Sequence, residues 1–224
     1  MNDTKGQASG SLVRIALVLA LLSGLSYFVA SRMFEPSPVL VVWKGAGVGL
    51  LALWAAMQAR NLDSWLIAVV MAFGAAGDVL IDAMGLIPGA LAFLAGHIVA
   101  IGLYLRHRRE ALAPTQLALA IILVPAVVFI AWSLPENRED ALGIALYSFG
   151  LAAMAALAWT SRFPRYWVGI GAMLFVASDL LIFARIGPLA GSALPNLLIW
   201  PLYFTGQAMI AIGVVRTLSA NRAT

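Results

Sequence analysis

The chain has 224 residues, of which 62% are hydrophobic and 11% are charged, and its formal net charge is +4. A soluble domain carries about 25% charged residues, so this composition excludes an ordinary soluble domain and indicates a protein of the lipid bilayer. The absence of cysteine excludes disulfide bonds, thiolate nucleophiles and thiolate metal sites. The basic residues fall between apolar runs and form no single patch, so the positive charge does not indicate nucleic-acid binding.

Eight apolar stretches follow one another along the chain, each near the length of about 20 residues that a bilayer-spanning helix needs. Gly, Pro and charged residues separate them. We therefore predict an all-α, polytopic membrane protein with eight transmembrane helices, forming one domain over residues 12–217. The predicted spans are residues 12–31, 38–57, 64–84, 88–105, 115–133, 141–160, 166–184 and 196–217.

Short polar tails flank this domain. Residues 1–11 form the first tail, whose residues 1–10 we expect to be disordered, and residues 218–224 form the second. The first span has no clear small-residue cleavage site, so we expect it to be retained and not removed as a signal peptide. The connections between spans are also short, and any chemistry must therefore lie within the helix bundle.

Lysine and arginine are distributed unequally between the two sets of connections. Ten lie in the set that includes both termini, whereas three, Arg32, Arg138 and Arg185, lie in the opposite set. Basic residues near span ends favour the cytoplasmic side. We therefore expect a multi-pass protein of a bacterial inner membrane with both termini in the cytoplasm.

Polar residues interrupt the apolar spans at similar depths. A carboxylate at membrane depth costs about 2.5–3.5 kcal/mol, so it usually faces an interior site and has a partner. Asp78 and Asp179 are two such carboxylates, and both lie in similar sequence motifs, Gly-Asp-Val-Leu-Ile and Ser-Asp-Leu-Leu-Ile. At a rise of 1.5 Å per residue, one layer of polar residues falls about 8–14 Å below the outer surface. The layer contains Lys44, Asp78, His97, Tyr147, Asp179 and Tyr203.

The two aspartates are also related by their positions in the chain. They are 101 residues apart, which corresponds to four helices, and a Gly/Pro turn follows each of their helices at residues 85–89 and at Gly187-Pro188. A four-plus-four internal repeat would place the aspartates in corresponding positions that face each other. This repeat is a hypothesis.

Two charged residues near the aspartates have more than one interpretation. Asp82 shares a helix face with Asp78 and either takes part in a site or is solvated near the outer interface. Lys44 is a counter-ion for an aspartate, a point charge that binds phosphate, or a side chain that extends to the interface.

The remaining polar residues are hydrogen-bonding groups. His97 either supports a site or is a buried neutral histidine with one hydrogen bond. A metal site is not expected, because the other histidine, His107, lies in a basic cytoplasmic connection. Tyr203 and Gln207 are four residues apart on one helix face. Tyr27 is assigned no role, because tyrosines near an interface are often belt residues.

Taken together, these short motifs make the sequence resemble the YhhN family of membrane proteins, whose characterised members are lysoplasmalogenases. The resemblance covers nearly the whole chain. Two positions depart from the family pattern: Gly45 stands where a proline commonly follows the lysine, and Ala100 stands where a tyrosine commonly follows the histidine. The matching residues and motifs are Lys44, Gly77-Asp78-Val79-Leu80, Gly96-His97, Tyr147 with Met154, Ser178-Asp179 and Tyr203-Phe204-Thr205-Gly206-Gln207.

The resemblance implies hydrolysis of the vinyl ether bond of a lysoplasmalogen to an aldehyde and a glycerophospho-base, with no cofactor and no metal. Such a bond is cleaved by protonating its β-carbon, after which water attacks an oxocarbenium-like cation, so one protonated and one ionised carboxyl would suit the reaction. Asp78 and Asp179 are the expected pair. The expected partners are a lysophospholipid-type substrate and membrane lipids, with no nucleic acid and no implied protein partner. Supporting roles are expected for Lys44, Asp82, His97, Tyr147, Tyr203 and Gln207.

Two other classes of function also fit these residues. Carboxylates and a lysine at membrane depth also suit a proton-coupled transporter of small molecules or lipids. A lipid-binding protein without turnover is the other alternative. Release of aldehyde from a lysoplasmalogen by purified protein would separate an enzyme from both. Another enol ether, an epoxide or an ether lipid would also fit as the substrate.

The distribution of basic residues predicts the position of the C-terminus. A reporter fused after Thr224 should be active only in a form that works in the cytoplasm, because the connections on the same side as the two termini carry most of the arginine. Reporter activity in the periplasm would contradict the predicted orientation and the depths derived from it.

Overall fold

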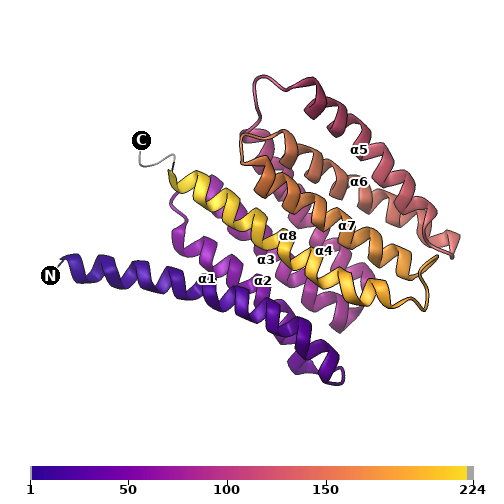
Figure 1. Cartoon of the computed structure of the whole chain (residues 1–224), viewed down its shortest axis with the longest axis horizontal. Helices are drawn as coiled ribbons and strands as arrows, with labels where there is room; N and C mark the ends of the chain where they lie inside the picture. The colour runs from indigo at the N-terminus through magenta and orange to yellow at the C-terminus, as the bar shows by residue number, and fades with distance from the viewer. Residues whose placement is uncertain (1, 221–224) are drawn as a thin grey trace. The chain divides into compact units, whose positions relative to one another are not determined.

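The computed structural model describes residues 2–220, and every regular element within that range is helical (Figure 1). Eight helices in this range are long and apolar enough to cross a membrane, which confirms the predicted all-α, polytopic architecture. A π-helical turn, η1, leads directly into α7. The elements are α1 (Asn2–Met33), α2 (Pro38–Gln58), α3 (Leu62–Met84), α4 (Leu86–Arg106), α5 (Pro114–Ser133), α6 (Arg138–Thr160), η1 (Arg165–Gly169), α7 (Ile170–Arg185) and α8 (Ala193–Ala220).

The ends of the helices differ from the prediction mainly at the N-terminus. Helix α1 begins at Asn2, so the expectation of disorder over residues 1–10 is wrong for residues 2–10. The polar residues extend the helix beyond its apolar segment, which hydropathy alone cannot detect. Helix α8 continues to Ala220, so the predicted tail begins inside a helix, and residues 221–224 lie outside the described range. All other helix ends lie within three residues of the predicted span ends when η1 is counted together with α7, which itself begins four residues after the predicted start at residue 166.

Local capping residues set the ends of the helices that carry the site. Ser37 accepts a hydrogen bond from the backbone of Leu40, and Pro38 occupies the first turn of α2. Asn61 and Ser64 form a reciprocal capping box at the start of α3. Gly85 ends α3 with a φ of 99°, a left-handed conformation that favours glycine. Helix α4 can therefore begin at the next residue.

The described residues form two compact units, one of residues 2–96 with 218–220 and the other of residues 97–217. In the first unit, α2 packs against α1 and α3. In the second unit, α6 packs against α5 and α7 (Figure 1). Asp78 belongs to the first unit and Asp179 to the second. The facing pair of aspartates and the four-plus-four repeat therefore stay predictions.

Glycines allow the helix backbones to approach closely next to the polar residues. A Cβ atom at Gly45 would lie 2.6 Å from Cγ2 of Val79, so α2 contacts α3 beside Lys44. In the second unit, a Cβ atom at Gly206 would lie 2.6 Å from the carbonyl oxygen of Gly171, which brings α8 against α7. Small residues at such contacts are a common means of helix association in membranes.

The connections after α4 and α6 bind each other. Arg108 and Ser161 form an isolated antiparallel β-bridge. The backbone N–H of Arg162 donates to the carbonyl of His107 over 2.7 Å, and Nε of Arg109 donates to the carbonyl of Ser161 over 2.6 Å. These bonds tie the C-terminal ends of α4 and α6 together, and both helices contribute a side chain to the site described next.

Candidate functional site

A chain of hydrogen bonds joins three of the predicted site residues across α4, α6 and α7. The hydroxyl of Tyr147 donates to Oδ2 of Asp179 over 2.5 Å. The oxygen of Tyr147 also lies 3.3 Å from Nε2 of His97. Asp179 and His97 are 4% and 3% exposed, respectively. The group is therefore a buried polar network contributed by three different helices.

The direction of these hydrogen bonds depends on the proton on Asp179. A hydroxyl has one hydrogen, and Tyr147 gives it to the carboxylate when Asp179 is ionised. Nε2 of His97 must then carry the hydrogen that it shares with the oxygen of Tyr147. When Asp179 holds a proton, its hydroxyl can donate to the oxygen of Tyr147, and Tyr147 can then donate to Nε2 of His97 if the imidazole carries its hydrogen on Nδ1.

Aromatic rings surround this network. The ring of Phe175 lies edge-on to His97 and to Tyr203, with centroid distances of 5.1 Å in both cases. Phe183 contacts the ring of Tyr147 edge-on at 5.9 Å. Edge-to-face contacts at these distances stabilise ring orientation. The rings therefore fix the imidazole and the phenol beside Asp179 and surround them with apolar groups.

Helix α8 adds a further pair of hydrogen-bonding residues. Nε2 of Gln207 donates to the hydroxyl oxygen of Tyr203 over 3.4 Å, and both side chains are buried. Beside Asp179, the hydroxyl of Ser178 donates to the carbonyl of Ile199 over 3.0 Å. This bond fixes the position of α7 against α8. Five predicted site residues thus belong to one unit: His97, Tyr147, Asp179, Tyr203 and Gln207.

The other three predicted site residues lie in the first unit. Nζ of Lys44 and Oδ1 of Asp82 form an ion pair of 2.8 Å, so the structure selects Asp82 as the counter-ion of this lysine. Asp78 lies one helical turn before Asp82 and is 2% exposed. Tyr27 of α1 is close enough to both carboxylates to interact with them electrostatically. The ion pair of Lys44 and Asp82 thus joins α2 to α3, and Tyr27 of α1 lines the same pocket as Asp82.

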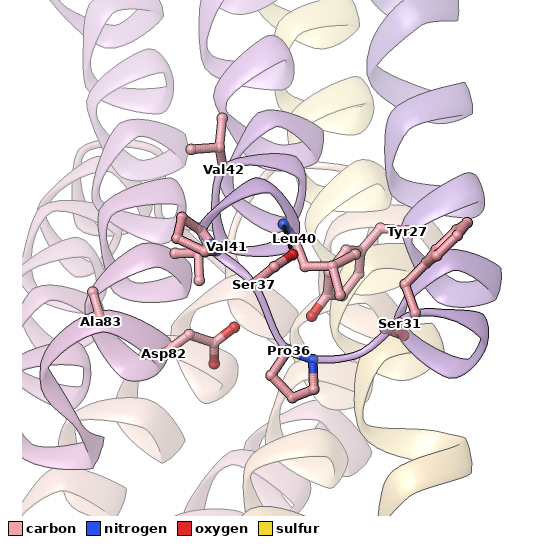
Figure 2. A pocket seen from close by; sticks show the side chains of 11 residues that line it. Tyr27, Ser31, Pro36, Ser37, Leu40, Val41, Val42, Asp82 and Ala83 are labelled. Atoms are coloured by element: carbon pink, nitrogen blue, oxygen red, sulfur yellow. Dashed lines mark hydrogen bonds between the residues drawn. The ribbon is translucent and has the colours of Figure 1, made fainter.

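Asp82 also faces a pocket of about 730 Å³ at the connection between α1 and α2 (Figure 2). Tyr27, Ser31 and Ser37 contribute hydroxyl groups to its wall. Tyr27 is not among the predicted site residues, because it resembles an interfacial belt residue. The spacing of Tyr27 and Ser31, one helical turn apart on the same face of α1, was a signal that could have identified them.

The described residues contain no group of three or more His, Cys, Asp or Glu side chains arranged to hold a metal ion. The roles of the predicted site residues, and the expectation that no cofactor takes part, stay predictions.

Residues 39–214 match the YhhN family, which is most of the chain. The chain belongs to the YhhN family. Two proteins named lysoplasmalogenase, from Mycobacterium bovis (strain ATCC BAA-935 / AF2122/97) and Mycobacterium tuberculosis (strain CDC 1551 / Oshkosh), are each 32% identical to this YhhN protein over 130 residues. The match covers 56% of the chain and 49% of each relative, so the chain spans about half the length of the curated relatives it matches. No solved structure matches it.

The buried network predicts different effects for two similar tyrosine substitutions. Tyr147→Phe should lower the free energy of unfolding by about 1–3 kcal/mol, because it removes the donor to Asp179 and leaves a buried acceptor unsatisfied. The matched control is Tyr104→Phe, since the buried hydroxyl of Tyr104 has no hydrogen-bond partner among the described residues. Its removal should leave stability unchanged or slightly higher. Denaturation of both variants in one detergent tests this, and equal losses would contradict the assigned network.

Proposed function

We propose that this YhhN protein is a membrane-embedded hydrolase that cleaves the vinyl ether bond of lysoplasmalogens. The observation that carries the proposal is the buried hydrogen bond from Tyr147 to Asp179 in a chain whose curated relatives are named lysoplasmalogenase. A buried carboxylate with an oriented donor is the kind of group that stabilises a cation and moves a proton. The substrate would enter from the bilayer.

The proposed reaction consumes one water molecule. A carboxyl group transfers its proton to the β-carbon of the vinyl ether, and the carbon attached to oxygen becomes an oxocarbenium-like cation. Water attacks that carbon and gives up a proton to the second carboxylate. The resulting hemiacetal gives its hydroxyl proton to the first carboxylate as the aldehyde forms, and its bond to the glycerol oxygen breaks while that oxygen takes the proton held by the second carboxyl group. The products are a fatty aldehyde and a glycerophospho-base, and both carboxyl groups return to their starting states.

The structure supports an assignment of the two carboxyl roles within this proposal. The hydroxyl of Tyr147 donates to Asp179, and a donor to a carboxylate favours its ionised form. We therefore assign Asp179 as the ionised group that faces the cation and receives the proton from water. Asp78 is then the proton donor. When Asp179 becomes protonated, its hydroxyl can donate to the oxygen of Tyr147, which holds the carboxyl group in place.

Four other residues have supporting roles in the proposal. Tyr147 and His97 are positioning residues for Asp179, since they act through that carboxylate. Tyr203 and Gln207 offer a hydroxyl and an amide that can orient the substrate or the water.

The proposal predicts that Asp78→Asn and Asp179→Asn each lower turnover at least about 10²-fold, the usual lower bound for loss of acid–base help. If both groups serve one reaction, the double variant should lose little more turnover than the less active of the two single variants. The effects of substituting residues that act as a unit are not additive. The measurement is aldehyde release from a lysoplasmalogen by each purified variant in detergent.

The matched control is Asp140→Asn, which neutralises an exposed carboxylate in the first turn of α6 and should leave turnover unchanged. Full activity in either single aspartate variant would refute the pair. Absence of aldehyde from the wild-type protein, together with movement of substrate across vesicles, would favour the transporter alternative.

A further inference from the structure

Five arginines are brought together where α4 and α6 end. In the sequence they lie in two connections far apart, and only the antiparallel bridge and the backbone bonds described above place these connections side by side (Figure 1). Glu110 is the only acidic residue in segments 106–110 and 161–167. These two segments together are the basic surface of the second unit. Its arginines are Arg106, Arg108, Arg109, Arg162 and Arg165.

Two of the guanidinium groups are held between the connections. Nε of Arg109 donates to the carbonyl of Ser161 over 2.6 Å. Nε of Arg162 donates in the opposite direction, to the carbonyl of Arg108 over 3.0 Å. A guanidinium carries more N–H groups than these bonds use, so both arginines still present donors from fixed positions. The ion pair of Arg162 with Glu110 is exposed, with side-chain exposures of 58% and 89%. Such a pair contributes little to stability, and a stronger anion can displace the carboxylate.

The side chains of Arg108 and Arg165 add positive charge without joining the connections. Arg108 is exposed and contributes its backbone to the bridge with Ser161. The guanidinium of Arg165 lies 5.7 Å from the centre of the Tyr166 ring. Both side chains are therefore available to a ligand, and both can be substituted without breaking the bonds between the connections.

The basic surface lies at the level where a bilayer presents its phosphate groups. The apolar spans of α4 and α6 end at Arg106 and Thr160, and the next span begins at Arg165. Tyr166 and Trp167 are 70% and 46% exposed, and these residue types are enriched at the headgroup level of membranes. A phospholipid in the bilayer can therefore bring its phosphate to the arginines while its chains stay beside the apolar spans.

The charge of the surface distinguishes between classes of bilayer lipid. A guanidinium matches the geometry of a phosphate group and can donate two parallel hydrogen bonds to it. A zwitterionic lipid would also bring its own cationic group among several arginines, where like charges repel. An anionic lipid has no such group, and clusters of basic residues beside membrane spans attract anionic lipids.

We propose that the basic surface binds an anionic phospholipid with two acyl chains, and that this lipid stabilises the second unit. Its phosphate contacts arginines from both connections, and Arg108 and Arg165 supply charge that is not used to join them. Because the surface connects the ends of α4 and α6, the bound lipid stabilises the contact between the helices that carry His97 and Tyr147. The inference goes beyond the proposed hydrolysis, since this lipid is bound and not cleaved.

Binding to the purified wild-type protein in a neutral detergent is the first test. The probe is phosphatidylglycerol with a photoactivatable headgroup, and its crosslinks should fall in segments 106–110 and 161–167. The competitors are unlabelled phosphatidylglycerol, phosphatidylcholine and free glycerol phosphate. Phosphatidylcholine should compete at least about fivefold more weakly than phosphatidylglycerol. Free glycerol phosphate should compete at least about tenfold more weakly, because it makes no apolar contacts.

A double variant tests the contribution of the arginines. Arg108→Gln/Arg165→Gln keeps the bonds between the connections and should weaken binding of phosphatidylglycerol at least about fivefold, since each basic residue near the membrane surface adds to the attraction. Phosphatidylglycerol should also raise the Tm of the wild-type protein, because a ligand of the folded state stabilises it. This rise should be lost in the double variant.

The matched control is Arg14→Gln/Arg60→Gln, which removes the same charge from exposed positions of the first unit. It should keep both the affinity and the rise in Tm. Equal losses in the two double variants would show a general effect of charge and overturn the proposal. Crosslinks spread equally over other segments, or equal competition by phosphatidylcholine or glycerol phosphate, would also overturn it, and these results come from the wild-type protein alone. Binding without aldehyde release from a lysoplasmalogen would keep this inference and remove the proposed hydrolysis.

Discussion

A carboxylate surrounded by hydrocarbon needs hydrogen-bond donors from neighbouring helices, and this constraint organises the second unit of the protein. Tyr147 supplies one donor to Asp179, and His97 completes the chain from a third helix. The contact between Gly171 and Gly206 and the bond from Ser178 to Ile199 hold α7 against α8 beside it. Loss of any of these contacts would leave a buried polar group unsatisfied or open a gap in the packing.

The first unit meets the same constraint differently. Asp82 is paired with the charge of Lys44, and both are partly exposed beside a pocket. Asp78 is almost completely buried one turn deeper in α3. The two carboxylates of α3 therefore occupy different environments, although they share a helix face. This difference is the physical reason for proposing a chemical role for Asp78 and not for Asp82.

Hydropathy was sufficient to predict the architecture, because a bilayer requires long apolar helices and the chain has short connections. It failed at the start of α1, where polar residues extend the helix. Residue type also singled out His97, Tyr147 and Asp179, which the structure joins by hydrogen bonds, since polar groups are rare in such spans. Helix packing decides which of these side chains donates to which, that Lys44 pairs with Asp82, and where Tyr27 lies. These contacts join residues that are far apart in the chain, so local sequence patterns do not predict them.

In the proposed reaction a carboxyl group protonates carbon, and the rate of turnover in heavy water tests that step most directly. Aldehyde release from a lysoplasmalogen by the purified protein is measured in H₂O and in D₂O at matched acidity. Turnover should be slower in D₂O, because the transferred hydrogen comes from a solvent-exchangeable acid and its transfer to carbon limits the rate. Equal turnover in the two solvents would contradict rate-limiting protonation of the vinyl ether by a carboxyl group.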